Sequence, residues 1–130
     1  MRTGELGIEF DAGAYLFRQG EGGDRLYVVL EGEVELLLKH EGHEVRIAGC
    51  GVGDTIGEEV IFEHGGHSMD ARAVTKVRVL GVDRRNFLRR ASKDPTLVFG
   101  ILKQLSRRVR ELGAELARLR VPVGSGPPVG

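Results

Sequence analysis

Short apolar stretches rich in β-branched residues recur through the first two thirds of the chain, and glycines interrupt them at close intervals. The stretches are LGIEF, AYLFRQG, RLYVVLEG, EVELLLKH, EVRIAG, ARAV and VRVLGVD. Such residues favour strands, and the 20 glycines are typical of tight turns between strands. The pattern predicts an all-β roll over about residues 6 to 83, with hairpin turns at LEGEV and KHEGHEV.

The hydrophobic period changes after Asp83 from the alternation of strands to the spacing of helices. It predicts one helix over about residues 84 to 92 and a long one over about 95 to 120, separated at Pro95. The last ten residues, VPVGSGPPVG (121 to 130), are rich in proline and glycine, and we expect a flexible tail there.

The long helix carries an apolar stripe with intervals of 3, 4, 3, 4 and 3 residues, which Val98 extends backwards. Its members are Leu102, Leu105, Val109, Leu112, Leu116 and Leu119. This is the a/d pattern of a coiled coil. The stripe could instead pack on the chain's own roll, but it continues farther than a small roll can cover, and Glu115 could meet Arg120 of a parallel partner. We therefore predict a homodimer with its interface over residues 97 to 119.

Length and composition favour one domain of 130 residues. The single cysteine, Cys50, excludes an internal disulfide, and we expect it to be packed as a small apolar residue. No apolar run approaches the ~20 residues that span a bilayer. These features predict a cytoplasmic protein that has no membrane partner.

The zero net charge conceals an asymmetry between the two halves. Residues 1 to 66 carry 5 Lys/Arg and 14 Asp/Glu, whereas residues 67 to 130 carry 14 and 5. The basic blocks RRNFLRR and SRRVR alternate with apolar residues at helical spacing, and no nucleic-acid recognition motif accompanies them. We expect solvated helix faces that meet the acidic half, and no direct nucleic-acid binding.

The most distinctive polar stretch is GEEVIFEHGGHS, residues 57 to 68. Gly57 would let the backbone approach a ligand closely, and an acidic pair follows it directly. A glycine, a carboxylate and a later polar pair suit a sugar phosphate, but an acid and a histidine together also suit a metal. The loop is the candidate site, and the residue types leave both chemistries open.

The order of glycines over residues 9 to 120 resembles the cyclic-nucleotide-binding domain of the catabolite-activator and FNR superfamily of regulators. The resemblance rests on FDAGAYLFRQGEGGDRLYVVLEGEVEL, GVGDTIGEEVIF and ARAVTKVRVLGVDRRNFLRR. It implies a mainly β domain over residues 1 to 120, a double-stranded, jelly-roll-like β-roll followed by a long dimerisation helix. The ligand that it implies is a cyclic nucleotide, namely cyclic AMP, cyclic GMP or a cyclic dinucleotide.

The resemblance also implies roles for the loop. Gly57 opens a short helix whose N–H groups face a cyclic phosphate, and Glu58 accepts a hydrogen bond from the ribose hydroxyl. Where the family carries an arginine and a serine or threonine, this chain has His67 and Ser68. Glu59 adds a second negative charge. The ligand-binding set is Gly57, Glu58, Glu59, His67 and Ser68, and the nearby acids are expected to raise the pKa of His67.

The chain departs from the cyclic-AMP activators on the long helix as well, where Leu112 and Gly113 replace a Thr-Ser pair that reads the base. We therefore expect weak binding through a degenerate site. One alternative is a vestigial pocket on a dimerisation or protein-interaction scaffold.

The other alternative is a metal or haem sensor that uses His64 and His67. His40, His43 and Glu63 are further candidate ligands, although no His-x-His pair with a following carboxylate occurs. No nucleophile with a placed base is evident, so we expect no enzyme and no certain cofactor. Ten residues after Arg120 cannot form a helix-turn-helix, and we expect either the sensor portion of a longer regulator or a stand-alone module.

Overall fold

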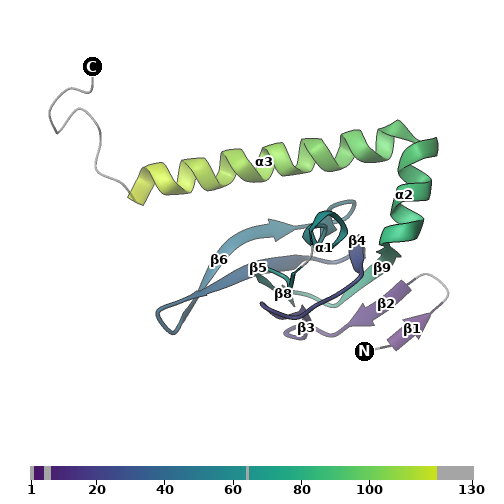
Figure 1. Cartoon of the computed structure of the whole chain (residues 1–130). Helices are drawn as coiled ribbons and strands as arrows, with labels where there is room; N and C mark the ends of the chain where they lie inside the picture. The colour runs from purple at the N-terminus through teal and green to yellow at the C-terminus, as the bar shows by residue number, and fades with distance from the viewer. Residues whose placement is uncertain (1, 5–6, 64, 120–130) are drawn as a thin grey trace, which may run out of the picture.

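The computed structural model describes residues 2 to 4, 7 to 63 and 65 to 119. In these ranges the chain forms two antiparallel sheets (Figure 1). The last strand is followed by a helix of 10 residues and then by one of 25 residues. The predicted tail over residues 121 to 130 lies outside the described residues, as does Arg120. Mainly β structure with carboxyl-terminal helices is confirmed.

The strands divide between two sheets. The five-stranded sheet contains, in spatial order, β1 (Arg2–Gly4), β2 (Gly7–Phe10), β9 (Val77–Asp83), β4 (Arg25–Glu31) and β7 (Thr55–Ile56). The four-stranded sheet contains β3 (Tyr15–Phe17), β8 (Asp70–Ala73), β5 (Val34–His40) and β6 (His43–Cys50). The strand β1 begins before the predicted start of the roll.

The two sheets enclose one apolar core, because alternate side chains of each strand point to the same face. Its buried members include aromatic, aliphatic and sulfur-containing side chains from both sheets. They are Phe10, Phe17, Val29, Val34, Leu36, Cys50, Ile56, Ala71, Ala73, Val77 and Val79. Cys50 is buried in this core, as expected.

Of the two predicted hairpin turns, one is confirmed. KHEGHEV joins β5 to β6, and His40 pairs with His43. LEGEV was predicted wrongly, because the chain there crosses from β4 in one sheet to β5 in the other. Gly32 makes this crossing with a φ of 88°, and a Cβ atom there would lie 2.2 Å from the Lys76 carbonyl oxygen. The glycine therefore serves a close passage between layers.

The helices begin and end close to the predicted positions. After the short α1 (Glu59–Phe62), the chain forms α2 (Arg84–Lys93) and α3 (Pro95–Leu119). Asp83 caps α2 by accepting a 2.7 Å hydrogen bond from the Asn86 backbone N–H. Pro95 occupies the first position of α3, where its missing N–H costs no helical hydrogen bond.

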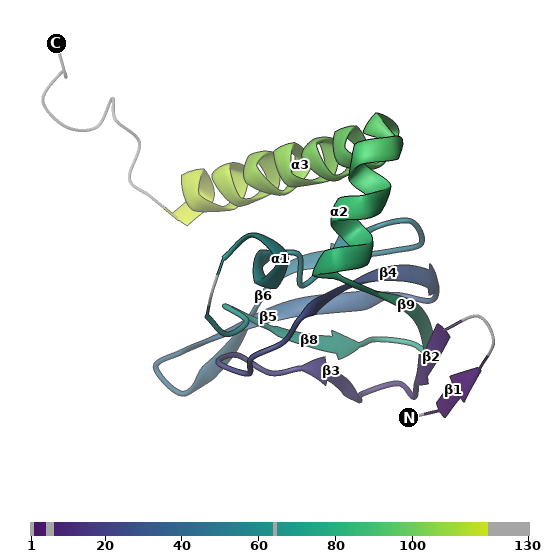
Figure 2. The same cartoon turned by 45° about the vertical axis from the view of Figure 1, so that its right-hand side comes forward.

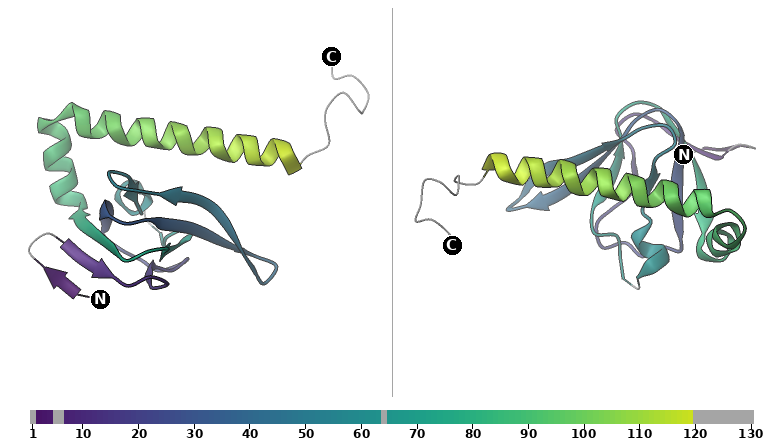
Figure 3. Two further views of the ribbon diagram at one scale, coloured as in Figure 1. Left: turned by 180° about the vertical axis from the view of Figure 1, so that it is seen from behind. Right: turned by 90° about the horizontal axis from the view of Figure 1, so that it is seen from above.

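A second apolar cluster joins the helices to the roll. Its buried members are Leu26, Ile61, Val82, Phe87 and Ile101. Figures 2 and 3 show that α2 rises from the end of β9 and that α3 then passes over the roll and over α1. This second cluster thus anchors the first half of α3 to the sheets.

Gln104 of α3 is hydrogen-bonded directly to the roll. The Gln104 amide donates to the Thr55 carbonyl and hydroxyl oxygens at 2.7 and 3.0 Å, and its oxygen accepts from the Thr55 N–H at 2.5 Å. Both residues are buried. These hydrogen bonds set the position of α3 beside the loop that follows Thr55.

No helix among residues 2 to 4, 7 to 63 and 65 to 119 is long and apolar enough to cross a membrane.

Candidate functional site

The candidate loop leaves β7 at Ile56 and passes through Gly57 and Glu58 into α1, which has only four residues. Gly57 has a φ of 74°, a conformation that L side chains rarely adopt. A Cβ atom there would lie 3.0 Å from His67 Cε1 and 3.1 Å from Phe17 Cε2. Gly57 therefore lets the two ends of the loop pack against the roll.

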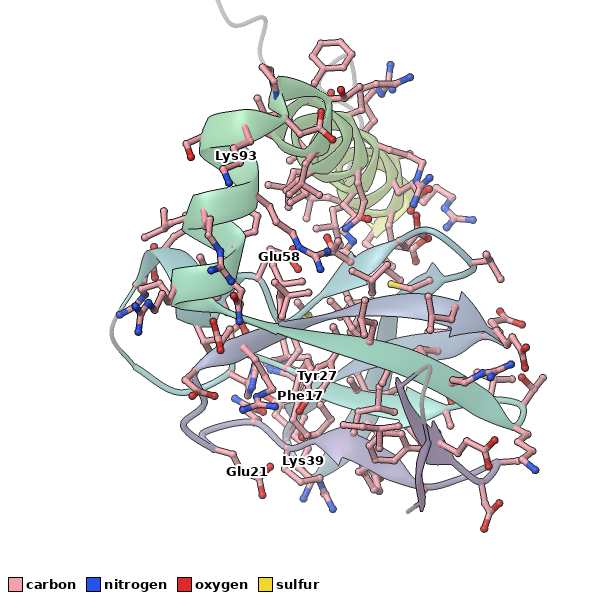
Figure 4. All side chains as sticks on the ribbon, turned by 90° about the vertical axis from the view of Figure 1, so that its right-hand side faces the viewer. Phe17, Glu21, Tyr27, Lys39, Glu58 and Lys93 are labelled. Carbon is pink, nitrogen blue, oxygen red and sulfur yellow. The ribbon has the colours of Figure 1, made fainter. Side chains whose placement is uncertain are left out.

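Glu58 lies in the contact between the roll and α3 (Figure 4). It is 8% exposed, and its Oε1 accepts a hydrogen bond of 2.7 Å from Arg108 Nη1. Burial raises the pKa of Glu58, and the Arg108 charge opposes that rise. The second oxygen, Oε2, is buried and accepts no hydrogen bond from the described part of the chain. One oxygen of Glu58 is thus bonded to Arg108, and the other is a buried acceptor.

Arg108 connects α3 to three places at once. Besides Glu58, its Nη2 donates to the Thr55 carbonyl oxygen at 2.5 Å and lies 3.2 Å from Cys50 Sγ. A planar guanidinium suits such divergent acceptors because its N–H groups point in fixed directions. The positive charge of Arg108 on α3 therefore compensates the negative charge of Glu58 in the loop.

Glu59 bonds to the far end of the same loop. Its Oε1 accepts from the Ser68 backbone N–H at 2.7 Å, and its Oε2 accepts from the Ser68 hydroxyl at 2.8 Å. Both carboxylate oxygens are therefore bonded to one serine. This contact ties the start of α1 to the residues before β8.

His67 is packed into the roll and is only 5% exposed. Its ring stacks on Phe17 with 3.7 Å between the ring centroids, and its Nδ1 lies 3.6 Å from Glu59 Oε1. Burial lowers the pKa of His67, while Glu59 and Glu21 oppose that effect. The expectation that neighbouring acids raise the pKa of His67 is therefore wrong in its net direction, because desolvation of the ring outweighs them.

A cavity of about 450 Å³ lies between the loop and α3. Carboxylates and one guanidinium supply its polar lining, and apolar side chains from both elements supply the rest. The lining residues are Glu58, Glu59, Phe62, Glu63, Met69, Leu105, Arg108, Val109 and Leu112. Its volume falls within the ~300 to 1,000 Å³ typical of small-molecule sites, which also combine apolar walls with a few polar groups.

The five residues of the predicted ligand set lie in one region but face different ways. Glu58 and Glu59 line the large cavity, whereas Gly57 and His67 pack against Phe17 behind it. Ser68, with Glu59, lines a smaller hollow of about 60 Å³ beside the loop. Direct ligand contact by any of the five residues stays a prediction.

Sequence reasoning missed Arg108, the basic residue of this site. The sequence does contain a pattern that could have revealed Arg108. A second face of the long helix carries Ile101, Gln104, Leu105 and Arg108, at spacings of 3, 1 and 3 residues. That face contacts the roll through Ile101, Gln104 and Arg108. The a/d stripe beside it masked the signal.

The expectation that the basic helices meet the acidic half is confirmed by three arginines. Arg107 pairs with Asp54 at 3.0 Å, and Arg108 pairs with Glu58. Arg84 donates to the backbone carbonyl oxygens of Val60 and Ile61 at the end of α1. Some of the basic residues of the second half of the sequence thus contact the acidic first half within the fold.

The predicted dimer stripe lies largely on the outside of the single chain. Leu102, Val109, Leu112, Leu116 and Leu119 are exposed, from 41% at Leu112 to 76% at Leu119. Leu105 is an exception, since it packs partly against the cluster around Ile101. The exposed part of the stripe therefore consists of Leu102 and of the second half of α3 from Val109 onwards.

A metal site would require several His, Cys, Asp or Glu side chains close together. No group of three or more His, Cys, Asp or Glu side chains in residues 7 to 63 and 65 to 119 is placed to hold a metal ion. His64, one of its two named ligands, lies outside the described residues.

A β-roll whose glycine-led loop faces a long carboxyl-terminal helix across a ligand-sized cavity defines a class of small-molecule-binding domains. A family model described as "Cyclic nucleotide-binding domain" matches residues 8 to 94, which is more than half of the chain. The chain belongs to this family, as the resemblance in its sequence indicates.

Known proteins support the same assignment. The CRP-like cAMP-activated global transcriptional regulator of Mycobacterium tuberculosis is 32% identical over 113 residues, covering 86% of this chain and 50% of that protein. The crystal structure of Thermus thermophilus catabolite activator protein has a TM-score of 0.73 at 32% identity, covering 86% and 53%. The chain spans about half the length of the curated relatives that it matches.

One further solved structure supports the fold alone. The c-di-GMP responsive global regulator CLP of Xanthomonas campestris has a TM-score of 0.81 at 22% identity, covering 86% of this chain and 57% of that one. Likeness of this kind bears on the roll and its long helix and not on the ligand of this chain.

Proposed function

We propose that the chain is a non-catalytic ligand-sensing and dimerisation module that binds a cyclic nucleotide or a related phosphate ligand weakly. The observation that carries this proposal is the cavity of about 450 Å³ between the loop and α3. A ligand in it would touch Glu58 and Glu59 on the loop side and Leu105, Val109 and Leu112 on the helix side. Binding would therefore be felt by the roll and the long helix together.

Polar groups of the cavity suit a sugar attached to an apolar or aromatic base. The buried Glu58 Oε2 lacks a donor among the described residues, and a ribose hydroxyl would supply one. Phe62, Met69 and Leu112 offer apolar surface for a base. The Arg108 charge is already used by Glu58, which leaves little to attract a phosphate and favours weak binding.

Dimerisation belongs to the same proposal. Val109 and Leu112 line the cavity and also belong to the exposed stripe of α3. A second copy that packs on this stripe would cover apolar surface and lie at the open side of the cavity. Ligand occupancy would then change how the two long helices pack, which is a means of signalling to a partner or to an attached domain.

The test is a titration of the purified chain with cyclic AMP, cyclic GMP and cyclic di-GMP, by calorimetry and by thermal unfolding. We expect one of them to raise the Tm, because a ligand that binds only the folded state stabilises it, with a Kd above ~10 µM. Glu58→Gln should weaken that binding, whereas Glu41→Gln, in the distant β5–β6 turn, should not.

A chain that binds none of the three ligands but remains dimeric would be a scaffold with a vestigial pocket. Elemental analysis and an absorption spectrum of the same sample test the metal and haem alternative. A stoichiometric metal or a haem band would contradict the proposal.

A further inference from the structure

The Glu59 carboxylate occupies a pair of hydrogen-bond donors that would otherwise suit an anion. The Ser68 backbone N–H and hydroxyl donate to its two oxygens at 2.7 and 2.8 Å. Two donors on one residue, converging on one carboxylate, form a small anion-binding arrangement. In this chain the anion is supplied by the protein itself.

The position of this contact places it at the wall of the ligand cavity. Glu59 lines the cavity of about 450 Å³ together with Glu58, and it also lines the hollow of about 60 Å³ that Ser68 borders. The smaller hollow has room for about two water molecules. An anionic group of a ligand in the large cavity can therefore reach the Ser68 donors only if the Glu59 carboxylate leaves them.

The charges around the cavity act in the same direction. Glu58, Glu59 and Glu63 contribute three carboxylates to its lining, and Arg108 contributes the single guanidinium. That guanidinium is bonded to Glu58 at 2.7 Å. A phosphate entering the cavity would meet uncompensated negative charge at Glu59 and Glu63, and like charges close together repel.

A buried acceptor without a partner among the described residues lies on one of the side chains that line the cavity. Glu58 is 8% exposed, and its Oε2 has no partner in the described part of the chain. It lines the same cavity as Glu59. The site therefore presents an acceptor for hydroxyl or amide groups and a barrier to anionic groups.

We propose that Glu59 determines the ligand preference of this cavity by holding the Ser68 donors and excluding the negatively charged group of a ligand. This inference rests on the proposed function, and it explains why binding of a cyclic phosphate is weak. Removing the Glu59 charge should release the two donors and convert the cavity into a better phosphate site.

The experiment compares Glu59→Gln and Glu59→Leu with Glu63→Gln. The control removes a carboxylate of the same cavity that has no hydrogen bond to Ser68 in the described structure. The Glu59 side chain is 32% exposed, so either replacement should fold, and thermal unfolding checks this. Calorimetry then measures binding of cyclic AMP, which carries a phosphate charge, and of adenosine, which carries none.

We expect both Glu59 variants to bind cyclic AMP at least about tenfold more tightly than the native chain, a change of ~1.4 kcal/mol. Glu63→Gln should gain no more than about threefold, because it removes a like charge but releases no Ser68 donor. Adenosine should bind all four proteins about equally, because it needs no anion site. Adding Ser68→Ala to Glu59→Leu should remove part of the gain, since it deletes one of the released donors.

The outcomes separate this inference from the proposed function. If the native chain binds cyclic AMP and the Glu59 variants bind it no better, or adenosine gains equally, the role of Glu59 is overturned and the function stands. If only the Glu59 variants bind, the role of Glu59 is supported, and native binding is overturned. If no protein binds cyclic AMP, the role of Glu59 is overturned, and the proposed function is decided by the titrations with cyclic GMP and cyclic di-GMP.

Discussion

Arg108 of the long helix and Glu58 of the loop form a buried ion pair with 2.7 Å between Nη1 and Oε1. Fifty residues separate the two in the sequence, so the contact exists only because α3 returns over the roll. It joins the element expected to sense a ligand to the element expected to form a dimer.

Arg108→Met should destabilise the fold by about 3 kcal/mol, because removing one partner of a buried pair leaves an uncompensated charge. The Glu58 carboxylate would then keep its burial without the guanidinium that opposes the rise of its pKa. Urea unfolding measures the loss. Arg110→Ala, at an exposed position two residues on, is the matched control and should change the free energy of unfolding little.

The double variant Glu58→Gln with Arg108→Met sharpens this test. It should be more stable than Arg108→Met alone, since no buried charge is left without a partner. Equal stability of the two variants would mean that the arginine acts through packing and not through its charge.

His67 should make the fold less stable in acid. Because burial lowers the pKa of His67 in the folded state, the unfolded chain binds its proton first as the pH falls through ~6.5. The His67 contribution to the Tm should therefore be intact above pH 7 and decline between about pH 7 and 5. Glu58, whose pKa is raised, affects stability with the opposite sign, but it is present in all three proteins compared and does not alter their differences.

The measurement compares the change in Tm with pH for the native chain and for His67→Gln. The variant should show a flatter profile over that window, even if lost stacking on Phe17 lowers its Tm throughout. His43→Gln, at an exposed position, should keep the native slope. Parallel profiles for all three proteins would show that His67 does not titrate as its burial requires.

Gly57→Ala should cost about 1 to 3 kcal/mol, the usual range for a side chain held at a positive φ. The φ of 74° disfavours any Cβ atom, and the new methyl group would press on the rings of His67 and Phe17 at about 3 Å. Gly53→Ala has a φ of 90° with no neighbour within 4 Å, so it isolates the backbone part of the cost. Thermal unfolding should rank Gly57→Ala as the more harmful change.

The dimer prediction is most cleanly tested at Leu112 and Leu116, both of which are exposed. Lysine at both positions should give a monomer in analytical ultracentrifugation while the far-ultraviolet spectrum is retained, because two charges would be buried in the seam. Lysine at Ala114 and Ala117, exposed and outside the a/d positions, is the control and should leave the dimer intact. A native chain that is monomeric at all concentrations would contradict the predicted dimer interface itself.

Leu105 is less suitable for that test than its heptad position indicates. It packs partly against the cluster around Ile101, so a lysine there would disturb the fold as well as the interface. The heptad pattern alone does not distinguish these two contributions.

The strands and helices could be predicted because their signals are local. Glycine-containing turns separate the strands. The change of hydrophobic periodicity after Asp83 places α2 and α3 within about one residue at each described end. The LEGEV turn was wrong for a physical reason: a glycine between two strands has the same signature whether the strands pair or lie in different sheets. Only the strand pairing, which puts β4 beside β9 and β7 and puts β5 beside β8 and β6, decides it.

The site could be predicted as a loop but not as an arrangement of side chains. Glu59 and Ser68 are nine residues apart, and nothing in their sequence shows that they bond to each other. Arg108 meets Glu58 and Thr55 across 50 and 53 residues. Likewise, the burial that lowers the pKa of His67 comes from Phe17 and the surrounding roll, which sequence neighbours do not reveal.

The three hydrogen bonds between Gln104 and Thr55 hold α3 beside the loop, and within the next turn Arg107 and Arg108 bond to Asp54, Glu58 and Thr55. Sliding the helix along its axis would break all of them, whereas a tilt about Gln104 can keep them. From Gln104 to Leu119 the helix extends ~22 Å, so a tilt of ~10° displaces its end by ~4 Å. A tilt about this bonded turn would therefore enlarge small adjustments around Arg108 at the exposed leucines that a second copy would meet.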